Sequence, residues 1–284
     1  MKHPSVIKLF RIRENKKRWQ RRGLPFRYRS PMANYGRFKT RAKTFHGEVH
    51  GNKVSELDGN PMFGTAKPIK EHKLEDLTIL VPVEPSKIIA VGLNYADHAK
   101  ESGKELPKEP LIWFKAPSSL LEHEGTIRVP YTKHRTDYEA ELCVVIGKRT
   151  KGVSVKDAPS YIFGYTCSQD VSDRDIQRSE SQWARAKSFD TFTPVGPFVR
   201  NDLDPTNLQI QLFQNGELRQ NSRTDQLIFK VPFLLHFLSQ HITFMPGDII
   251  LTGTPFNVQP IKAGDQLEVR IEGLAPLKNS VANA

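Results

Sequence analysis

The sequence predicts a β-rich protein with few helices, and three features support this prediction. Short segments of alternating character, such as Tyr35–Lys39 and Lys43–Val49, are separated by Gly and Asn turns. Aliphatic and β-branched runs that end in Gly, such as Leu142–Gly147, are typical of buried strands. The hydrophobic content is 38%, and no apolar run approaches the roughly 18 residues that span a bilayer. We therefore expect a soluble chain without membrane segments.

Residues 1–31 form a basic leader that carries most of the charge. The chain has a net charge of +11, and the leader holds eleven Lys or Arg and one acid, which leaves +1 for residues 32–284. A nearly neutral body argues against a nucleic-acid-binding protein, apart from the leader itself. The leader has no apolar h-region of a secretory signal. It is a disordered tail that binds polyanions, an organelle transit peptide, or sequence upstream of a true start at Met32.

Two regions are expected after the leader. Residues 32–85 read as a small β-rich N-terminal region of three or four strands, without residues that suggest chemistry. Residues 86–284 read as a second, larger domain, which holds the residues that suggest chemistry. Its expected elements are, in chain order, a strand ending at Gly92, a helix from about Asp97 to Ser102, strands near 111–120, 142–147 and 164–170, a strand over 208–213, a helix over 231–238, and two turn-plus-strand units near 246–255 and 263–271.

A pair of acids opens the strand that ends at Gly147. Side chains two residues apart in a strand point to the same face, so Glu139 and Glu141 are expected side by side. A solvent-exposed hairpin face would also explain this spacing. Cys143 and Val145 continue the same face, however, which favours an inward orientation. Buried neighbouring carboxylates repel each other unless they share a cation or a proton.

A third acid, Asp170, ends the next predicted strand, Gly164–Gln169. Three carboxylates from two strands can cap one face of a hard divalent cation and leave its other face to substrate. Mg²⁺, Mn²⁺ and Ca²⁺ all accept carboxylate oxygens. The acids therefore predict a metal site.

Further polar residues cluster around these acids in the sequence. His98 and Glu101 are three residues apart on the expected helix and suit a general base oriented by a carboxylate, although a surface pair has the same spacing. Arg174 and Gln177 follow Asp170 closely. Lys187 follows in a partly apolar stretch, where its ammonium suits a substrate carboxylate or enolate.

The two cysteines, Cys143 and Cys167, both fall in expected buried strands and form no CxxC pair. We interpret them as reduced core residues of a reducing compartment, although a disulfide between them is compatible with the sequence.

Five motifs, in order and with matching spacing over roughly residues 86–281, resemble the fumarylacetoacetate hydrolase family, especially its acylpyruvase and 2-hydroxyhepta-2,4-diene-1,7-dioate isomerase members. The motifs are Gly92–Glu101, Asp137–Leu142, Gly164–Asp175, Lys187–Pro197 and Leu251–Pro255.

This resemblance implies a mixed β-rich (α+β) fold, a rolled β-sandwich or barrel with few helices, paired as a homodimer. It implies Mg²⁺ or Mn²⁺ as cofactor, with Ca²⁺ as a substitute. It also implies that Glu139, Glu141 and Asp170 bind the metal and that Lys187 and Thr254 contact the substrate. By the same resemblance, Arg174 and Gln177 line or support the site. His98 with Glu101 would activate water on a mobile lid.

The resemblance also implies a substrate class. A 2-oxo acid can chelate the metal, which then acts as a Lewis acid and stabilises a metal-bound enolate. Water activated by His98 would make the reaction a C–C hydrolysis of a 2,4-dioxo acid such as an acylpyruvate or fumarylacetoacetate. Isomerisation or tautomerisation of 2-oxo or 2-hydroxy-dienedioates, and decarboxylation of oxaloacetate, use the same enolate. The presence of both His98 and Glu101 favours the hydrolase, in a cytoplasmic setting or an organellar one if the leader is a transit peptide.

An alternative from another class is a non-catalytic protein that binds polyanions through its leader. Such binding would depend steeply on salt concentration. It would also predict lost metal ligands, yet all three acids are present.

Overall fold

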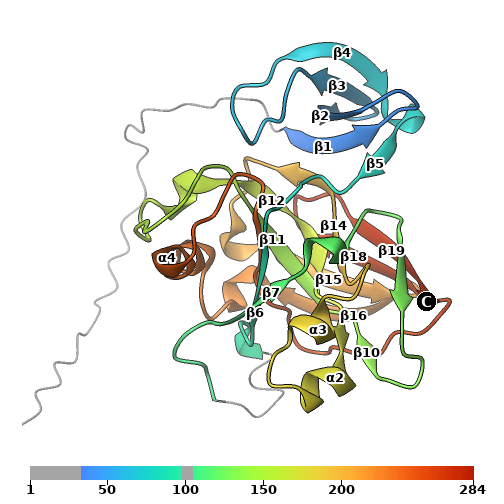
Figure 1. Ribbon diagram of the computed structural model, residues 1–284, viewed down its shortest axis with the longest axis vertical. Helices are drawn as coiled ribbons and strands as arrows, with labels where there is room; N and C mark the ends of the chain where they lie inside the picture. The colour runs from blue at the N-terminus through green and yellow to red at the C-terminus, as the bar shows by residue number, and fades with distance from the viewer. Residues whose placement is uncertain (1–32, 98–104) are drawn as a thin grey trace, which may run out of the picture. The chain divides into compact units, whose positions relative to one another are not determined.

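The computed structural model describes residues 33–97 and 105–284, and strands in three sheets dominate it (Figure 1). The expected β-rich fold with few helices is confirmed. The α-helices within the described residues are α2 (Arg174–Ser179), α3 (Ala184–Lys187) and α4 (Val231–His241). The helix expected over 231–238 is thus α4, whereas the helix expected over 97–102 lies outside the described residues apart from Asp97. None of the helices described is long and apolar enough to cross a membrane.

The largest sheet contains twelve strands along an open path. In spatial order these are β4 (Pro68–Lys73), β3 (Lys53–Leu57), β2 (Thr44–His50), β1 (Asn34–Lys39), β14 (Thr193–Arg200), β12 (Ile162–Gln169), β11 (Ala140–Ile146), β17 (Ile249–Leu251), β6 (Ile88–Gly92) and β7 (Leu111–Lys115), with β5 (Thr78–Leu80) beside β1 and β8 (Leu120–Leu121) beside β14. The β17–β6 and β14–β8 pairs are parallel and the other pairs are antiparallel, so the sheet is mixed.

Strands β1 to β5 gather at one end of this sheet, coloured blue to cyan in Figure 1. They continue the sheet through β1, which pairs with β14 at Asn34 and Tyr35. Phe38, Phe45 and Val54 give these strands a small hydrophobic cluster of their own. Alternating apolar residues explain this cluster, because alternate side chains of β1 and β2 are buried on one face.

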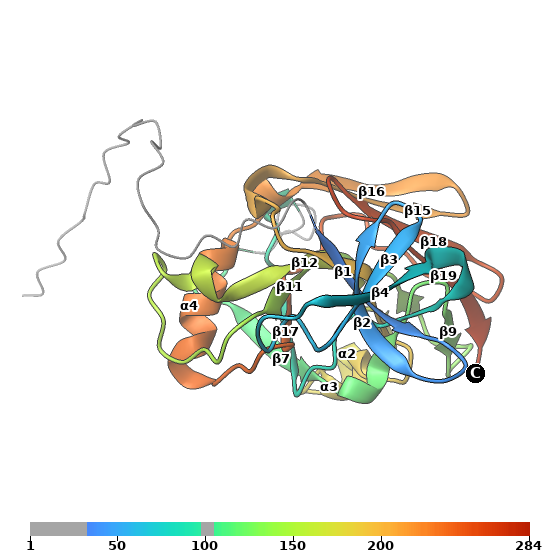
Figure 2. The same cartoon turned by 90° about the horizontal axis from the view of Figure 1, so that it is seen from above.

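A five-stranded sheet packs against the large one. Its order is β16 (Glu217–Arg223), β15 (Gln209–Gln214), β18 (Gln266–Ile271), β19 (Leu277–Asn283) and β9 (Thr126–Val129), and a two-stranded sheet joins β10 (Thr136–Asp137) to β13 (Ser172–Asp173). Figure 2 shows α4 on one side of the central strands and β15, β16, β18 and β19 on the other.

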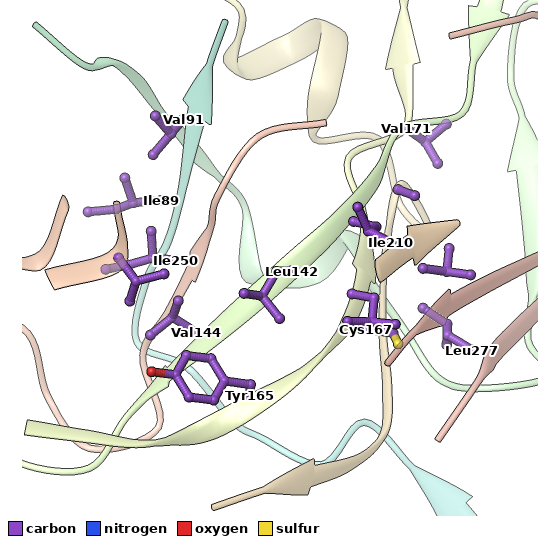
Figure 3. Packing of buried hydrophobic residues seen from close by; sticks show 14 of the residues in the cluster. Ile89, Val91, Leu142, Val144, Tyr165, Cys167, Val171, Ile210, Ile250 and Leu277 are labelled. Atoms are coloured by element: carbon purple, nitrogen blue, oxygen red, sulfur yellow. The ribbon is translucent and has the colours of Figure 1, made fainter. Parts of the chain in front are cut away.

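The main core lies between the two larger sheets, as Figure 3 shows for Leu142 of β11, Cys167 of β12, Ile210 of β15 and Leu277 of β19. All seven residues of β11 are buried, because both of its faces are covered. Leu142 pairs with Cys167, so Cys143 points to the opposite face, into a second cluster. Both thiols are buried and free.

Candidate metal centre and active site

The acids predicted as metal ligands meet where β11 begins and β12 ends. Glu141 is the second residue of β11, and Glu139 immediately precedes the strand. β12 runs antiparallel to β11, and the Asp170 N–H donates to the Glu139 carbonyl over 3.0 Å. This antiparallel register brings Asp170 beside the pair. Oxygens of the three carboxylates lie within 4.8 Å of one another, and all three residues are buried. We call Glu139, Glu141 and Asp170 the buried carboxylate cluster.

Lys187 and Arg174 neutralise one part of this cluster. The Lys187 Nζ donates to Glu139 Oε2 over 2.9 Å and to Asp170 Oδ2 over 2.6 Å. The Arg174 Nη2 donates to Glu139 Oε1 over 2.6 Å, and its Nε donates to Asp137 Oδ2 over 2.9 Å. The Lys187 ammonium also lies 4.6 Å from the centre of the Trp113 ring, within cation–π range.

The helix that carries Arg174 is fixed by its own first turn. Asp173 caps α2 by accepting from the backbone N–H groups of Asp175 and Ile176. Arg174 and Gln177 then lie three residues apart on one face. The Arg174 Nη1 donates to Gln177 Oε1 over 2.7 Å, which confirms that these two side chains are neighbours behind the acids.

Glu141 differs from its neighbours because it has no cationic partner among the described residues. Its Oε2 accepts from the Gly253 N–H over 2.7 Å. Gly253 has φ +99°, and a Cβ there would come within 2.8 Å of Asn94, so only glycine presents this donor without strain. Burial, followed by the charges of Asp170 and Glu139, raises the Glu141 pKa well above its ordinary value.

Glu139 titrates in the opposite direction from Glu141, although the two are only two residues apart. Burial opposes its ionisation, but the charges of Lys187 and Arg174 outweigh burial and lower the Glu139 pKa to about 2. Burial likewise opposes the charge of Lys187, yet Asp170 and Glu139 raise the Lys187 pKa. One face of the cluster is thus neutralised, whereas Glu141 forms no ion pair among the described residues and the charge of Lys187 offsets only part of the effect of its burial. Buried oxygen donors with uncompensated negative charge fit a hard divalent cation.

A cavity of about 300 Å³ opens onto this cluster. Its walls include six residues predicted from the sequence, which are Glu139, Glu141, Arg174, Gln177, Lys187 and Thr254. Trp113 and Trp183 also line it, with ring centres 5.1 Å apart in an edge-to-face arrangement. This volume is at the low end for ligand pockets and suits a small molecule. Of the other three predicted residues, Asp170 belongs to the cluster without lining the cavity, and His98 and Glu101 lie outside the described residues.

Sequence reasoning missed Lys115, which is fully buried at the end of β7. Its ammonium forms an ion pair with Asp170 Oδ1 and donates to the Phe192 carbonyl over 3.0 Å. Burial lowers the Lys115 pKa, and the charge of Asp170 only partly offsets this effect. A lysine that closes an otherwise apolar strand, Leu111–Lys115, was the available signal.

Gln220 was also missed, and it holds the loop that carries Thr254. Its Nε2 donates to Thr254 Oγ1 over 3.0 Å and to the carbonyls of Pro255 and Phe256 over 2.9 and 3.1 Å. Its Oε1 accepts from the Ala140 N–H over 3.0 Å. The surrounding residues of β16 are mostly polar, so the sequence gives no sign that Gln220 is fully buried.

A second group of possible ligand atoms lies nearby, in His134, Asp173 and Asp175, which we call the helix-capping cluster. The His134 Nδ1 lies 2.8 Å from Asp173 Oδ2, and the Arg135 N–H donates to Asp175 Oδ2 over 2.6 Å. The other oxygen of Asp173, Oδ1, accepts from the first backbone N–H groups of α2, so the carboxylates of this cluster already serve the helix cap and the preceding turn.

Comparison with known proteins places these residues in a family. The fumarylacetoacetate hydrolase C-terminal model matches residues 87–282. An uncharacterized protein of Methanocaldococcus jannaschii is 47% identical over 211 residues, 74% of this chain and 89% of that protein. The mitochondrial oxaloacetate tautomerase FAHD2B of Bos taurus is 44% identical over 219 residues, 72% of this chain and 70% of that enzyme.

Solved structures agree with these matches. The 2-hydroxyhepta-2,4-diene-1,7-dioate isomerase of Mycobacterium marinum superposes with a TM-score of 0.82 and 35% identity, covering 88% of this chain and 98% of the isomerase. The fumarylacetoacetate hydrolase of Exiguobacterium antarcticum gives a TM-score of 0.76 and 29% identity, covering 89% of this chain and all of that enzyme. Members of this family are hydrolases, isomerases and tautomerases. The chain that builds this carboxylate-lined cavity therefore belongs to the fumarylacetoacetate hydrolase family.

Proposed function

We propose that this protein is a divalent-metal-dependent enzyme that forms the enolate of a small 2-oxo acid. One observation carries the proposal, namely that three buried carboxylates lie together, one of them without a cationic partner among the described residues. Two of the three, Glu139 and Glu141, line a small cavity with Lys187, Arg174 and Thr254. Glu139, Glu141 and Asp170 would hold Mg²⁺ or Mn²⁺. When bound, the ion would supply Lewis acidity that stabilises negative charge developing on the keto oxygen.

The surrounding side chains would bind and orient the substrate. The Lys187 ammonium faces the cavity with its charge maintained by Glu139 and Asp170, so it can also attract a substrate carboxylate or enolate oxygen. Thr254 presents a hydroxyl whose position is fixed by Gln220. Arg174 is engaged by Asp137 and Glu139, and it would hold Glu139 and Gln177 in place.

We propose C–C hydrolysis of a 2,4-dioxo acid as one outcome. Water adds to the distal ketone carbon, the bond between that carbon and C3 breaks, and its electron pair becomes the enolate of the departing 2-oxo acid. The enolate then takes a proton at C3. His98, oriented by Glu101, is our candidate to remove the proton from water.

Keto–enol tautomerisation is the second candidate, and the oxaloacetate tautomerase of Bos taurus at 44% identity favours it. In this reaction a proton moves between C3 and the enol oxygen and no carbon–carbon bond breaks. The residues that line the cavity would serve tautomerisation as well as hydrolysis, because both reactions pass through the same enolate. The two reactions differ in whether water attacks.

We also propose a homodimer in a reducing, cytoplasmic or organellar compartment. The free thiols of Cys143 and Cys167 are consistent with a reducing environment. Leu111 and Phe114 expose about half of their surface on β7, the last strand of the large sheet. Exposed apolar side chains on an edge strand are compatible with pairing of two copies.

Turnover of three substrates by the purified protein tests the proposal. The panel is an acylpyruvate, oxaloacetate and a 2-hydroxy-dienedioate, each with Mg²⁺ and with EDTA. Pyruvate release from the acylpyruvate indicates the hydrolase, whereas loss of enol absorbance without cleavage indicates the tautomerase. We expect Glu141→Gln to abolish either activity and Asp175→Asn, in the helix-capping cluster, to retain it. Turnover that persists in EDTA or in Glu141→Gln would contradict the metal-dependent mechanism.

A further inference from the structure

Arg178, in the last turn of α2, lines the same cavity as the buried carboxylate cluster. Its side chain is 65% exposed, which places it at the mouth of the cavity. Among the described residues it pairs with Asp175, whose Oδ1 lies 3.9 Å from Arg178 Nη1. That separation is too long for a hydrogen bond.

The other two cations of the cavity are committed to acids. Lys187 contacts Glu139 and Asp170, and Arg174 contacts Glu139 and Asp137, all at 2.9 Å or less. Within the described part of the chain, only Arg178 among the cavity's cationic residues lacks such a contact. Its guanidinium donors therefore remain available to a ligand that enters the cavity.

The charge of the site indicates which ligand this is. The three acids of the buried carboxylate cluster face the ammonium groups of Lys115 and Lys187, and the guanidinium of Arg174 is shared with Asp137. A divalent ion added to this set leaves a surplus of positive charge. One substrate carboxylate at the ion neutralises that surplus, and Arg178 then adds a positive charge at the mouth that the first carboxylate leaves unpaired.

We infer that Arg178 binds a second carboxylate, at the far end of the substrate, and so selects 2-oxo dicarboxylic acids over 2-oxo acids with neutral tails. A guanidinium suits this task because its parallel N–H groups match the two oxygens of a carboxylate. The rings of Trp113 and Trp183, which line the cavity, can cover the carbon chain that joins the two carboxylates. This inference rests on the proposed 2-oxo acid chemistry and specifies its substrate class.

Paired ligands that differ only in the distal group test the inference by binding. Calorimetric titration of the Mg²⁺-loaded protein would compare 2-oxoglutarate with 2-oxopentanoate, which has the same chain length and one carboxylate. We expect wild type to prefer 2-oxoglutarate, and Arg178→Gln to weaken its binding roughly 10- to 100-fold, the usual range for a charge-assisted hydrogen bond. Binding of 2-oxopentanoate should change less than about twofold. Arg178→Lys should retain part of the preference, because it keeps the charge but not the fork of donors.

Steady-state kinetics supply a second readout with the same variants. The ratio of kcat/KM for oxaloacetate to that for acetylpyruvate should fall in Arg178→Gln, mainly through KM for oxaloacetate. Arg149→Gln is the matched control, since Arg149 is exposed beyond the opposite end of β11 and should leave the ratio unchanged.

The outcomes separate this inference from the proposed function. If wild type binds and turns over 2-oxo acids but Arg178→Gln weakens both classes equally, or neither, the role of Arg178 is wrong and the 2-oxo acid chemistry stands. If the Mg²⁺-loaded wild type binds none of these acids and turns over none, the proposed function fails and the inference fails with it.

Discussion

The buried carboxylate cluster and the helix-capping cluster contain similar ligand atoms at similar spacing, yet their chemistry differs. Each group brings three such atoms within 4.8 Å. In the helix-capping cluster, Asp173 is occupied by backbone donors and His134, and Asp175 accepts from the Arg135 backbone. In the buried carboxylate cluster, Glu141 accepts a hydrogen bond from the Gly253 N–H and forms no ion pair with a cation among the described residues.

Proximity of acids does not by itself make a metal site. Carboxylate oxygens whose lone pairs already accept hydrogen bonds in a helix cap stabilise the fold and are poorly available to a metal ion. Burial of a carboxylate without a cation, by contrast, leaves charge that a divalent ion can neutralise. The two clusters should therefore respond differently to mutation, protons and metal.

The largest difference is expected on removal of Lys187. In EDTA, Lys187→Met should lower the free energy of unfolding by about 3 kcal/mol, the lower end of the range for breaking a buried ion pair, because Lys115 and Arg174 retain their contacts. Mg²⁺ should restore part of this loss, since an ion that binds only the folded state stabilises it. Urea unfolding with EDTA and with Mg²⁺ measures both. Lys156→Met, at an exposed position, is the control, and an equal loss in both variants would contradict the prediction.

Acid dependence should distinguish Glu141 in the metal-free protein. Because its folded pKa is raised, the folded protein keeps a proton that the unfolded chain releases near pH 4.5. The resulting stability is fully present below that pH and is lost as pH rises toward the folded pKa, with a slope of at most about 1.4 kcal/mol per pH unit. The difference between unfolding curves of wild type and Glu141→Gln in EDTA isolates this slope.

Metal should reverse that trend. An ion bound by Glu141 requires the deprotonated carboxylate, so Mg²⁺ affinity should rise with pH over the same interval. A wild-type curve that parallels Glu141→Gln at every pH in EDTA would show that Glu141 ionises normally.

The smallest effect is expected in the helix-capping cluster. Asp173→Ala removes the α2 cap and the contact with His134, and should cost about 1 to 2 kcal/mol of stability. Mn²⁺ affinity should remain within about twofold of wild type, as should that of Asp175→Asn. Asp173→Asn keeps an acceptor for the cap and should recover most of the stability. A large loss of Mn²⁺ affinity in Asp175→Asn would make the second cluster a metal site after all.

Local spacing explains which parts of the site were predictable from sequence. Glu139 and Glu141 are two apart at the start of a strand, so this pair had a recognisable period. Arg174 and Gln177 were found only from their closeness to Asp170 in the sequence, and the helix α2 that carries them was not predicted. Strands β6, β11 and β12 and helix α4 were equally accessible, because their apolar patterns are strong. Strands β9, β14 and β19 were not predicted. The short strand β5 escaped prediction, since three residues show no clear alternation.

Contacts between distant segments could not be predicted in this way. Lys115 meets Asp170 across 55 positions, and Gln220 meets Thr254 across 34. Nothing local to either residue indicates its partner, because the pairing depends on sheet order and register. The same holds for the Gly253 N–H, which reaches Glu141 from 112 positions away.

Gln220 has a consequence for how this active site can diversify. One amide side chain links a hairpin strand, the start of β11 and the loop that carries Thr254. The hairpin β15–β16 is largely polar and tolerates sequence change on its exposed positions. Changes there that tilt β16 are expected, through Gln220, to shift the Thr254 hydroxyl without replacing any residue that lines the cavity. We therefore expect substitutions in the β15–β16 hairpin to reshape the cavity from a distance.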